Sequence, residues 1–260
     1  MKRAVLITGA TGGLGKEFAH YYGRQKKNLI LVARNEKALT ALAEEMRNTY
    51  HIEVLGIIQD LTEAEAVYRI DGKLKEANWQ VEGLVNNAGF GDFGRFHELA
   101  IARQTELVQV NVMAMMQLMH LVLDDMVKEN RGFIINVASL AAFVPGPLMA
   151  PYYASKAFVL SLTEGIAREL KGSKVKILAL CPGPTETGFE KNARLENSKL
   201  FSSLKVVPAK YVVEQGCKAL EKGKVIHVIG SFNRMLVFIS RFVPRRGVRN
   251  IIYHIQEEKK

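Results

Sequence analysis

Two adjacent tyrosines and a lysine stand in the stretch PYYASK, residues 151–156. On a helix, Tyr152 and Tyr153 lie four and three residues before Lys156, so both phenols are within reach of its ammonium group. A nearby positive charge favours the phenolate and lowers the pKa of a phenol from its usual value of about 10. That change brings the group toward the range in which general acid–base catalysis is efficient. The spacing therefore predicts a proton-transferring pair, but proximity alone does not choose between the tyrosines.

A glycine-rich turn, TGATGGLG at residues 8–15, follows the first apolar run of the chain. Glycine allows a tight turn and a close approach of the backbone to a ligand. The N-terminus of the helix that follows presents N–H groups and a positive dipole end to an anion. The spacing G-x-x-x-G-x-G differs from the commoner G-x-G-x-x-G fingerprint, but its place after a strand still predicts that the turn binds a dinucleotide pyrophosphate. The candidate residues in this turn are Thr8, Gly9, Thr11, Gly12, Gly13, Leu14 and Gly15.

The end of the second apolar run discriminates between dinucleotides. It reads Val32-Ala33-Arg34-Asn35, with no carboxylate before Glu36. A cofactor with a free 2′-hydroxyl favours an acidic residue about 20 positions after the turn, whereas an arginine pairs with a 2′-phosphate. Arg34 therefore predicts NADP(H) in preference to NAD(H). The alternative is a solvated arginine in the first turn of a helix.

The elements that must position these residues follow from the apolar pattern. Continuous apolar runs occur at residues 3–8, 28–33, 52–58, 81–87, 132–138, 175–181 and 224–230. Such runs are typical of strands that are covered on both faces of a parallel sheet. The stretches between them have helical periodicity, as at residues 35–48. The alternation predicts a doubly wound Rossmann fold, an α/β fold with about seven parallel strands and helices on both faces.

One domain over residues 1–260 is predicted, because no linker or repeat divides the chain. Polar and charged residues at 184–207 interrupt the pattern and predict a mobile insertion that acts as a substrate lid. Residues 231–260 are predicted to form a basic, amphipathic C-terminal extension, in which 232–255 mixes large apolar side chains with five arginines. This extension either closes the substrate pocket or lies on an anionic membrane surface.

Composition and charge limit the partners. The 260 residues are 48% hydrophobic and carry a formal net charge of +10, which favours anionic ligands. The positive charge outside the C-terminal part is scattered, so dedicated nucleic-acid binding is not expected. Cys181 and Cys217 form no C-x-x-C pair, which predicts a reducing, cytoplasmic setting. The N-terminal apolar run is too short for a signal peptide, no apolar run reaches the roughly 18 residues of a membrane span, and no His/Cys cluster predicts a metal site.

Together these motifs resemble the short-chain dehydrogenase/reductase family in its compact single-domain form, over nearly the whole chain from Thr8 to Gly230. TGATGGLG is similar to the TGxxxGxG turn of the family, and Tyr152 with Lys156 to its YxxxK pair. Further matches lie at the ends of later apolar runs: Asp60-Leu61, Asn86-Asn87-Ala88-Gly89, Ser139, and Pro182-Gly183 with Thr185 and Thr187. Asn111 lies in a long helical stretch, where the family places an active-site asparagine. The resemblance implies that the following residues bind the cofactor, beside the turn and Arg34: Asp60, Leu61, Asn87, Ala88, Gly89, Tyr152, Lys156, Pro182, Gly183, Thr185 and Thr187.

The resemblance also implies a catalytic set of Asn111, Ser139, Tyr152 and Lys156. Ser139 lies 13 residues before Tyr152, the usual separation in the family, which selects Tyr152 as general acid/base. Tyr153 is then rotated by about 100° around the helix and is expected to serve core or subunit packing. By resemblance, Ser139 hydrogen-bonds the substrate oxygen, Lys156 the nicotinamide ribose, and Asn111 holds a water that links Lys156 to solvent.

The expected function is an NADP(H)-dependent oxidoreductase, a carbonyl reductase that interconverts a carbonyl and a secondary alcohol by hydride transfer. The predicted pocket stretches 90–96, 141–149 and 184–207 have little polar content, and Phe93, Phe143, Val144, Leu148 and Met149 indicate a hydrophobic substrate. Two alternatives remain: an NADP-binding regulatory protein without turnover, and epimerase or dehydratase chemistry on the same scaffold.

Assembly and location are also expectations. Many family members form a homodimer or homotetramer through two helices that correspond here to the methionine-rich run 113–120 and the helix near Tyr152. Met113, Met116 and His120 lie on one helical face, which predicts core or subunit interface. We expect a cytoplasmic protein, with peripheral contact to a membrane surface as the alternative for the C-terminus.

Overall fold

The computed structural model describes residues 1–195 and 206–257, and its centre is a parallel sheet of seven strands. Their order in the sheet is β3-β2-β1-β4-β5-β6-β9, and every neighbouring pair is parallel. The strands are β1 (Lys2–Thr8), β2 (Asn28–Ala33), β3 (Val54–Ile58), β4 (Trp79–Asn86), β5 (Phe133–Val137), β6 (Lys176–Cys181) and β9 (Ile226–Val228). Each overlaps one of the apolar runs, so the predicted doubly wound α/β fold is confirmed.

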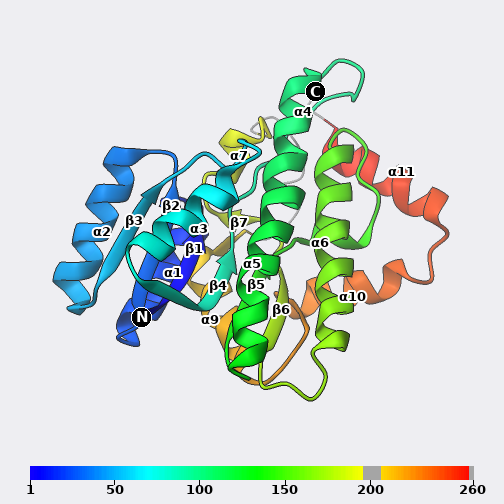
Figure 1. Cartoon of the computed structure of the whole chain (residues 1–260). Coiled ribbons are helices and arrows are strands. Elements are labelled where there is room, and N and C mark those ends of the chain that lie inside the picture. Colours follow the sequence, from blue (N-terminus) through cyan, green and yellow to red (C-terminus); the bar gives the residue numbers. More distant parts are fainter. Residues whose placement is uncertain (196–205, 258–260) are drawn as a thin grey trace.

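Helices cover both faces of the sheet (Figure 1). Side chains alternate across β1, so that Ala4 and Leu6 enter one core and Val5 and Ile7 the other. This is why the strands read as continuous apolar runs. The core around Val5 is closed by α1 (Gly13–Arg24), α2 (Glu36–Tyr50) and α9 (Ala209–Glu221). The core around Leu6 is closed by α3 (Ala66–Glu76), α5 (Met115–Lys128) and α6 (Ala150–Glu169).

The strand order reverses at β1, which pairs with β2 on one side and β4 on the other. Connections that leave adjacent strands in opposite directions open a crevice at their carboxyl ends, where open α/β sheets bind ligands. Thr8 and Asn86, at the ends of β1 and β4, mark this point. The predicted phosphate turn starts here, so the topology places it at the crevice.

A long helical run precedes β5 and differs from the expected regular helix. It consists of α4 (Ile101–Val108), a π-helical turn at Gln109–Ala114, and α5. Met113 and His120 are exposed while Met115 and Met119 are buried, so of the two roles expected for the Met113 face, core packing is excluded and a subunit interface stays a prediction. The π-helical turn contains Met113, and the other methionines of the run follow it in α5.

Among the described residues, one helix, Ile101–Lys128, is long and apolar enough to cross a membrane by length and composition alone. The uninterrupted apolar runs of the sequence did not indicate it. Its buried residues, including Leu118 and Val122, pack in the core against the sheet. A core helix of this kind passes the same test, so the segment carries no membrane assignment.

The C-terminal part adds two helices, α10 (Ser231–Ser240) and α11 (Arg245–Gln256), which lie together beside α6 at the opposite end of the molecule from α2 (Figure 1). The described part of the predicted lid contains β7 (Thr185–Glu186), α7 (Phe189–Asn192) and β8 (Val207–Pro208). β7 and β8 pair in a small sheet of their own. Residues 196–205 of that segment lie outside the described residues.

Candidate functional site

Side-chain hydrogen bonds join the ends of β1 and β4 at the phosphate turn. The Thr8 hydroxyl accepts from the backbone N–H groups of Asn87 and Ala88, both at 3.0 Å. The Asn87 amide donates to the carbonyl oxygens of Thr8 at 2.9 Å and Gly9 at 3.1 Å. These residues therefore fix the turn against the NNAG segment, a role that their place in the motif did not reveal.

Three glycines make this turn sterically possible. Gly9 has a backbone φ of +61°, a conformation that residues other than glycine rarely adopt. A Cβ at Gly15 would lie 2.2 Å from the Gly9 oxygen, and one at Gly13 would lie 2.7 Å from the Thr187 Cα. The close approach of Thr187 brings the segment after β6 over the start of α1. The glycine turn lines a cavity, and a dinucleotide phosphate fits there at the N-terminus of α1.

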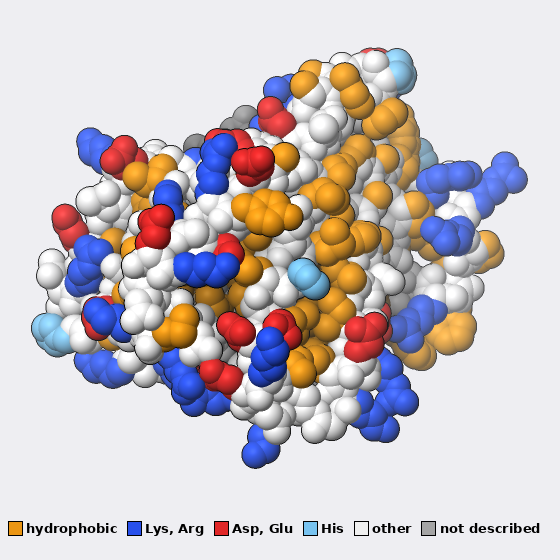
Figure 2. Space-filling view, in the orientation of Figure 1, with side chains coloured by type: hydrophobic (Ala, Val, Ile, Leu, Met, Phe, Trp, Pro, Cys, Tyr) orange, Lys and Arg blue, Asp and Glu red, His pale blue; other side chains and the backbone are white. Residues whose placement is uncertain are grey.

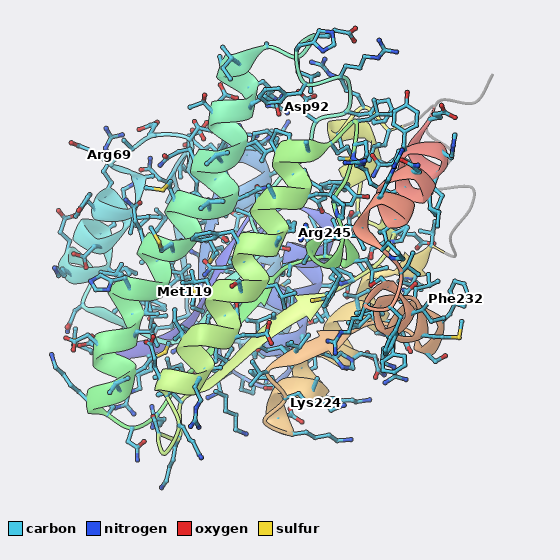
Figure 3. All side chains as sticks on the ribbon, turned by 90° about the vertical axis from the view of Figure 1, so that its right-hand side faces the viewer. Arg69, Asp92, Met119, Lys224, Phe232 and Arg245 are labelled. Atoms are coloured by element: carbon cyan, nitrogen blue, oxygen red, sulfur yellow. The ribbon has the colours of Figure 1, made fainter. Side chains whose placement is uncertain are left out.

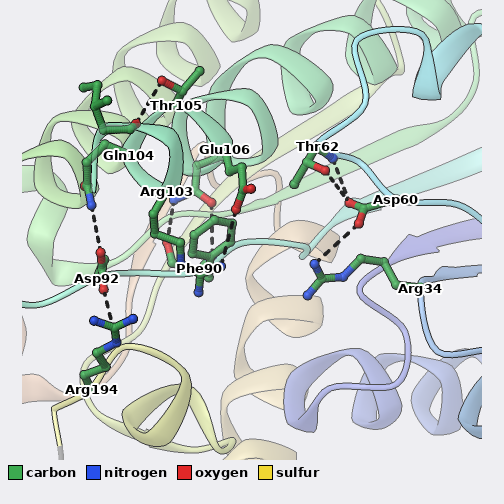
Figure 4. Close-up of polar contacts among 12 residues, drawn as sticks. Arg34, Asp60, Thr62, Phe90, Asp92, Arg103, Gln104, Thr105, Glu106 and Arg194 are labelled. Carbon is green, nitrogen blue, oxygen red and sulfur yellow. Dashed lines mark hydrogen bonds and ion pairs between the residues drawn. The ribbon is translucent and has the colours of Figure 1, made fainter. Parts of the chain in front are cut away.

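Arg34 and Asp60 lie together on the wall of this cavity (Figure 4). The guanidinium Nη1 is 3.5 Å from the carboxylate Oδ2, while Thr62 donates to Oδ1 from its backbone and its hydroxyl, both at 2.9 Å. Burial acts to raise the pKa of Asp60, but the Thr62 hydrogen bonds and the Arg34 charge outweigh it and lower that pKa. Arg34 precedes the cap residue Asn35, so it does not lie in the first helical turn, but its side chain is 64% exposed, as the solvated alternative expected.

Tyr152 lies on the buried side of α6, facing the cavity. Its ring is 5.3 Å from that of Phe189, and its hydroxyl lies near the Ser139 side chain. Burial raises the pKa of the phenol to about 12, against the opposing effect of the Ser139 hydrogen bond. The sequence predicted a pKa lowered by Lys156, but the exclusion of solvent dominates and raises it.

Lys156 is buried one turn further along α6. Its Nζ lies 5.8 Å from the centroid of the Tyr152 ring and donates to the Val137 oxygen at 2.8 Å. Burial lowers the pKa of this ammonium group to about 8, with a small opposing effect from the Cys181 thiol. The hydrogen bond to the end of β5 aims the amine into the cavity, and the fold thus positions the predicted YxxxK pair on one wall.

Asn111 lies in the π-helical turn, and its amide is fully engaged. The side-chain oxygen accepts from the Phe90 N–H at 3.1 Å, and the nitrogen donates to the Phe90 oxygen at 3.0 Å and the Ser155 hydroxyl at 3.1 Å. The Ser155 hydroxyl in turn donates to the backbone carbonyl oxygen of Tyr152 at 2.7 Å. Asn111 thus connects the NNAG loop to the start of α6 through Ser155, a residue that sequence reasoning missed. The water relay stays a prediction.

Tyr153 is buried behind Tyr152, with the two rings 6.0 Å apart in an edge-to-face arrangement. Its hydroxyl accepts a hydrogen bond from the buried amide of Gln256, near the end of α11. Gly146 lies directly on the ring, since a Cβ there would come within 2.1 Å of its carbons. The expected core role of Tyr153 is confirmed, and it also anchors the C-terminal helix beside the candidate site.

A single cavity of about 670 Å³ joins these parts. All predicted site residues except Thr8, Gly15 and Asn111 line it. Phe93 and Leu148 do not line it, so the predicted pocket is corrected at those two positions. The C-terminal part also lines the cavity: α10, α11 and the turn between them supply Leu236, Val237, Ile239, Ser240, Val243, Val248, Ile251, Ile252 and Ile255.

Charged residues near the NNAG loop also escaped prediction (Figure 4). The Arg103 guanidinium lies over the Phe90 ring, 4.1 Å from its centroid, and both residues line the cavity. Asp92 is buried, accepts from Gln104 at 2.8 Å, and lies 3.8 Å from the guanidinium of Arg194. These contacts tie the loop after β4 to α4 and to the segment after α7. The sequence carries no motif that could have indicated them.

Comparison with known proteins decides the family. The model of the short chain dehydrogenase family matches residues 3–198. The chain belongs to this family. Among its relatives, sulfoacetaldehyde reductase 2 of Chromohalobacter salexigens is 34% identical over 191 residues, which cover 73% of this chain and 75% of the relative. A 7β-hydroxysteroid dehydrogenase of Clostridium sardiniense is 28% identical over 229 residues, which cover 88% of this chain and 86% of the relative.

A solved structure of the family has the same fold over its whole length. The short-chain dehydrogenase from Sphingobium yanoikuyae, in complex with NADPH, superimposes with a TM-score of 0.81 at 27% identity, covering 100% of this chain and 98% of that one. The predicted membership of the short-chain dehydrogenase/reductase family is therefore confirmed. The protein is an oxidoreductase of this family, whose members act on hydroxyl and carbonyl groups.

Proposed function

We propose that the protein is an NADP(H)-dependent reductase that interconverts a hydrophobic carbonyl compound and its secondary alcohol, with Tyr152 as general acid/base. The observation that carries the proposal is the meeting of three side chains on one wall. The Tyr152 hydroxyl lies near the Ser139 side chain, and the Lys156 amine lies 5.8 Å from the Tyr152 ring centroid. The glycine turn opens to the same cavity. A proton donor and a dinucleotide-binding turn in one cavity fit carbonyl reduction.

In the reductive direction, negative charge develops on the substrate oxygen, and donors placed at that point stabilise it. A bound NADPH would supply the hydride to the carbonyl carbon. Ser139 donates a hydrogen bond to the oxygen, and Tyr152 transfers its phenolic proton there. With a pKa of about 12, the phenol is protonated at neutral pH, as a donor must be. The Lys156 ammonium group then favours the phenolate that this transfer leaves behind.

The pH dependence of carbonyl reduction is expected to follow the protonation of the Lys156 amine. Below pH 8 the amine is charged and the phenol protonated, so kcat/KM for reduction is expected to be constant there. As pH rises through about 8, Lys156 loses its proton and its effect on Tyr152, so kcat/KM falls. A pH profile of kcat/KM measures this fall above pH 8, and the Tyr153→Phe variant should show the same fall. A profile that stays flat well above pH 8 would contradict the assignment.

An apolar substrate is proposed from the cavity walls. Phe143, Val144, Met149, Phe189 and Leu195 line the cavity beside the apolar side chains of α10 and α11. Burial of apolar surface contributes about 25 cal/mol per Å² to binding, so such walls favour a bulky carbonyl compound over a small polar one. The similarity to a 7β-hydroxysteroid dehydrogenase supports this class of substrate. The position of Arg34 and the NADPH complex of a similar structure support the choice of NADP(H).

The proposal is tested by following NADPH oxidation against a panel of ketones, aldehydes and 3-oxoacyl thioesters. Turnover is expected to be highest with bulky apolar carbonyl compounds and low with small polar aldehydes. Tight NADPH binding without turnover of any compound would favour the regulatory alternative. Conversion of a sugar nucleotide or a hydroxy acid without net NADPH oxidation would favour epimerase or dehydratase chemistry.

Assembly as a homodimer or homotetramer in the cytoplasm is part of the same proposal. Apolar side chains gather over α4, α5 and α6 (Figure 2), and the exposed ones are Ile101, Val108, Met113, Val127 and Phe158. A contiguous apolar surface of this kind is typical of a subunit interface. Peripheral contact of the C-terminal helices with a membrane rests on different residues.

A further inference from the structure

Helix α10 contributes none of its side chains fully to the core. Its large apolar residues stay exposed on a surface that we call the C-terminal face, which comprises residues 232–251 of α10, α11 and the turn between them. The exposed apolar side chains of this face are Phe232, Met235, Leu236, Phe238, Ile239, Phe242 and Ile251. Phe238 and Phe242 pack on each other at 5.2 Å and still remain largely open to solvent. So many adjacent exposed apolar groups indicate an interaction surface.

The C-terminal face surrounds the mouth of the cavity. Leu236, Ile239 and Ile251 line the cavity and are also exposed, so they stand where it opens to the outside. Deeper along the same helices, Val237 and Ile252 continue the apolar lining toward Tyr153, to which Gln256 holds the end of α11. An apolar path therefore runs from the outer surface to the candidate site.

The face is also strongly basic. Its arginines are Arg234, Arg241, Arg245, Arg246 and Arg249, and all are exposed. No aspartate or glutamate occurs between residues 222 and 256, and within residues 1–195 and 206–257 none of the five arginines forms an ion pair with a carboxylate. Phe232 and Arg245 mark the starts of α10 and α11 on this face in Figure 3. Apolar and cationic groups without anions are the features of a helix that lies in an anionic lipid interface.

A second copy of the chain fits this face poorly. In a two-fold symmetric dimer the same patch lies on both sides of the interface. The arginines of one copy would then approach those of the other, with no acidic residue of the segment available to pair with them. Like charges placed opposite each other oppose association. An anionic bilayer instead offers negative headgroups to the arginines and hydrocarbon to the phenylalanines.

We propose that α10 and α11 dock the protein on the surface of an anionic lipid bilayer, with the mouth of the cavity turned toward the lipid. The apolar side chains enter the headgroup region and the arginines bind lipid phosphates. An apolar carbonyl compound dissolved in the bilayer then reaches the cavity without crossing water. This delivery rests on the proposed function, whereas the docking does not.

The test is co-sedimentation of the full chain with vesicles of phosphatidylcholine, with and without phosphatidylglycerol. The chain should bind the anionic vesicles, and added salt should weaken the binding. Each arginine near an anionic surface contributes about a fivefold gain in affinity, so the triple variant Arg245→Gln/Arg246→Gln/Arg249→Gln should lose about a hundredfold. Phe242→Ser should weaken binding as well, because it removes an apolar side chain that would enter the lipid.

Matched controls come from the opposite end of the molecule. The triple variant Lys37→Gln/Arg69→Gln/Lys75→Gln removes the same charge from α2 and α3 and should bind as the natural chain does. Tyr68→Ser is the control for Phe242→Ser, because each side chain is 73% exposed. All substituted side chains are exposed, and thermal unfolding of each variant checks that the fold is unchanged.

Three results would overturn the proposal: no binding to anionic vesicles, equal loss in the control triple variant, or dissociation of an oligomer by Phe242→Ser in sedimentation velocity. The last would assign the face to a second copy of the chain. Vesicle binding is measured without turnover, so a chain that binds lipid but reduces no carbonyl compound would overturn the proposed function alone.

Discussion

Tyr152→Phe is expected to reduce kcat for carbonyl reduction by about 10²–10⁴-fold, the contribution of a positioned general acid. The change removes only the hydroxyl group near Ser139 and keeps the ring that packs against Phe189 at 5.3 Å. The cavity and the glycine turn are left in place, so the dissociation constant of NADPH should stay close to that of the natural chain. Steady-state kinetics and fluorescence titration with NADPH measure the two quantities.

Tyr153→Phe is the matched control, since it removes a hydroxyl group from the adjacent residue of the same helix. That hydroxyl accepts from Gln256 of α11. Its loss leaves a buried amide without this partner and loosens the end of α11, so KM for a bulky substrate should rise while kcat changes little. Full activity of Tyr152→Phe, or an equal fall in kcat for both variants, would refute the assignment of Tyr152.

The sheet could be predicted from the sequence because its strands face two cores at once. Strand β1 buries four consecutive residues, Ala4, Val5, Leu6 and Ile7, so its sequence is one continuous apolar run without an alternation of polar and apolar residues. The glycine turn was equally accessible, because φ +61° at Gly9 and the contact of Gly15 with Gly9 are demands that glycine alone meets easily. In both cases a local residue type reports a local physical constraint.

The remaining parts of the site depend on contacts between segments that are far apart in the chain. The π-helical turn that lets Asn111 reach Phe90 and Ser155 has no signature in hydrophobic periodicity. The pKa of Tyr152 depends on how completely the fold excludes solvent, which the four-residue spacing to Lys156 does not contain. The two readings of the C-terminal helices were not alternatives, because the same helices line the cavity and expose an apolar, basic surface.

Arg34→Ala is expected to weaken NADPH binding by about tenfold to a hundredfold and to leave NADH binding nearly unchanged. Hydrogen bonds between charged partners contribute about 1.5–3 kcal/mol, and every 1.4 kcal/mol is about tenfold in affinity. Arg34 is held at the cavity wall by Asp60, 3.5 Å away, and keeps further donors of its guanidinium available for a 2′-phosphate. NADH has no such phosphate and loses nothing. Titration of both cofactors against both chains gives the ratio.

Lys37→Ala is the control for this comparison. It removes the same charge three residues further along the chain, from an exposed side chain that does not line the cavity. If general electrostatic attraction to an anionic cofactor were responsible, both variants would weaken NADPH binding alike and added salt would remove the difference between the natural chain and either variant. A loss confined to Arg34→Ala and to the phosphorylated cofactor instead requires a direct contact. Equal affinity of the natural chain for NADPH and NADH would refute the preference, because Asp60 would then satisfy Arg34 in both complexes.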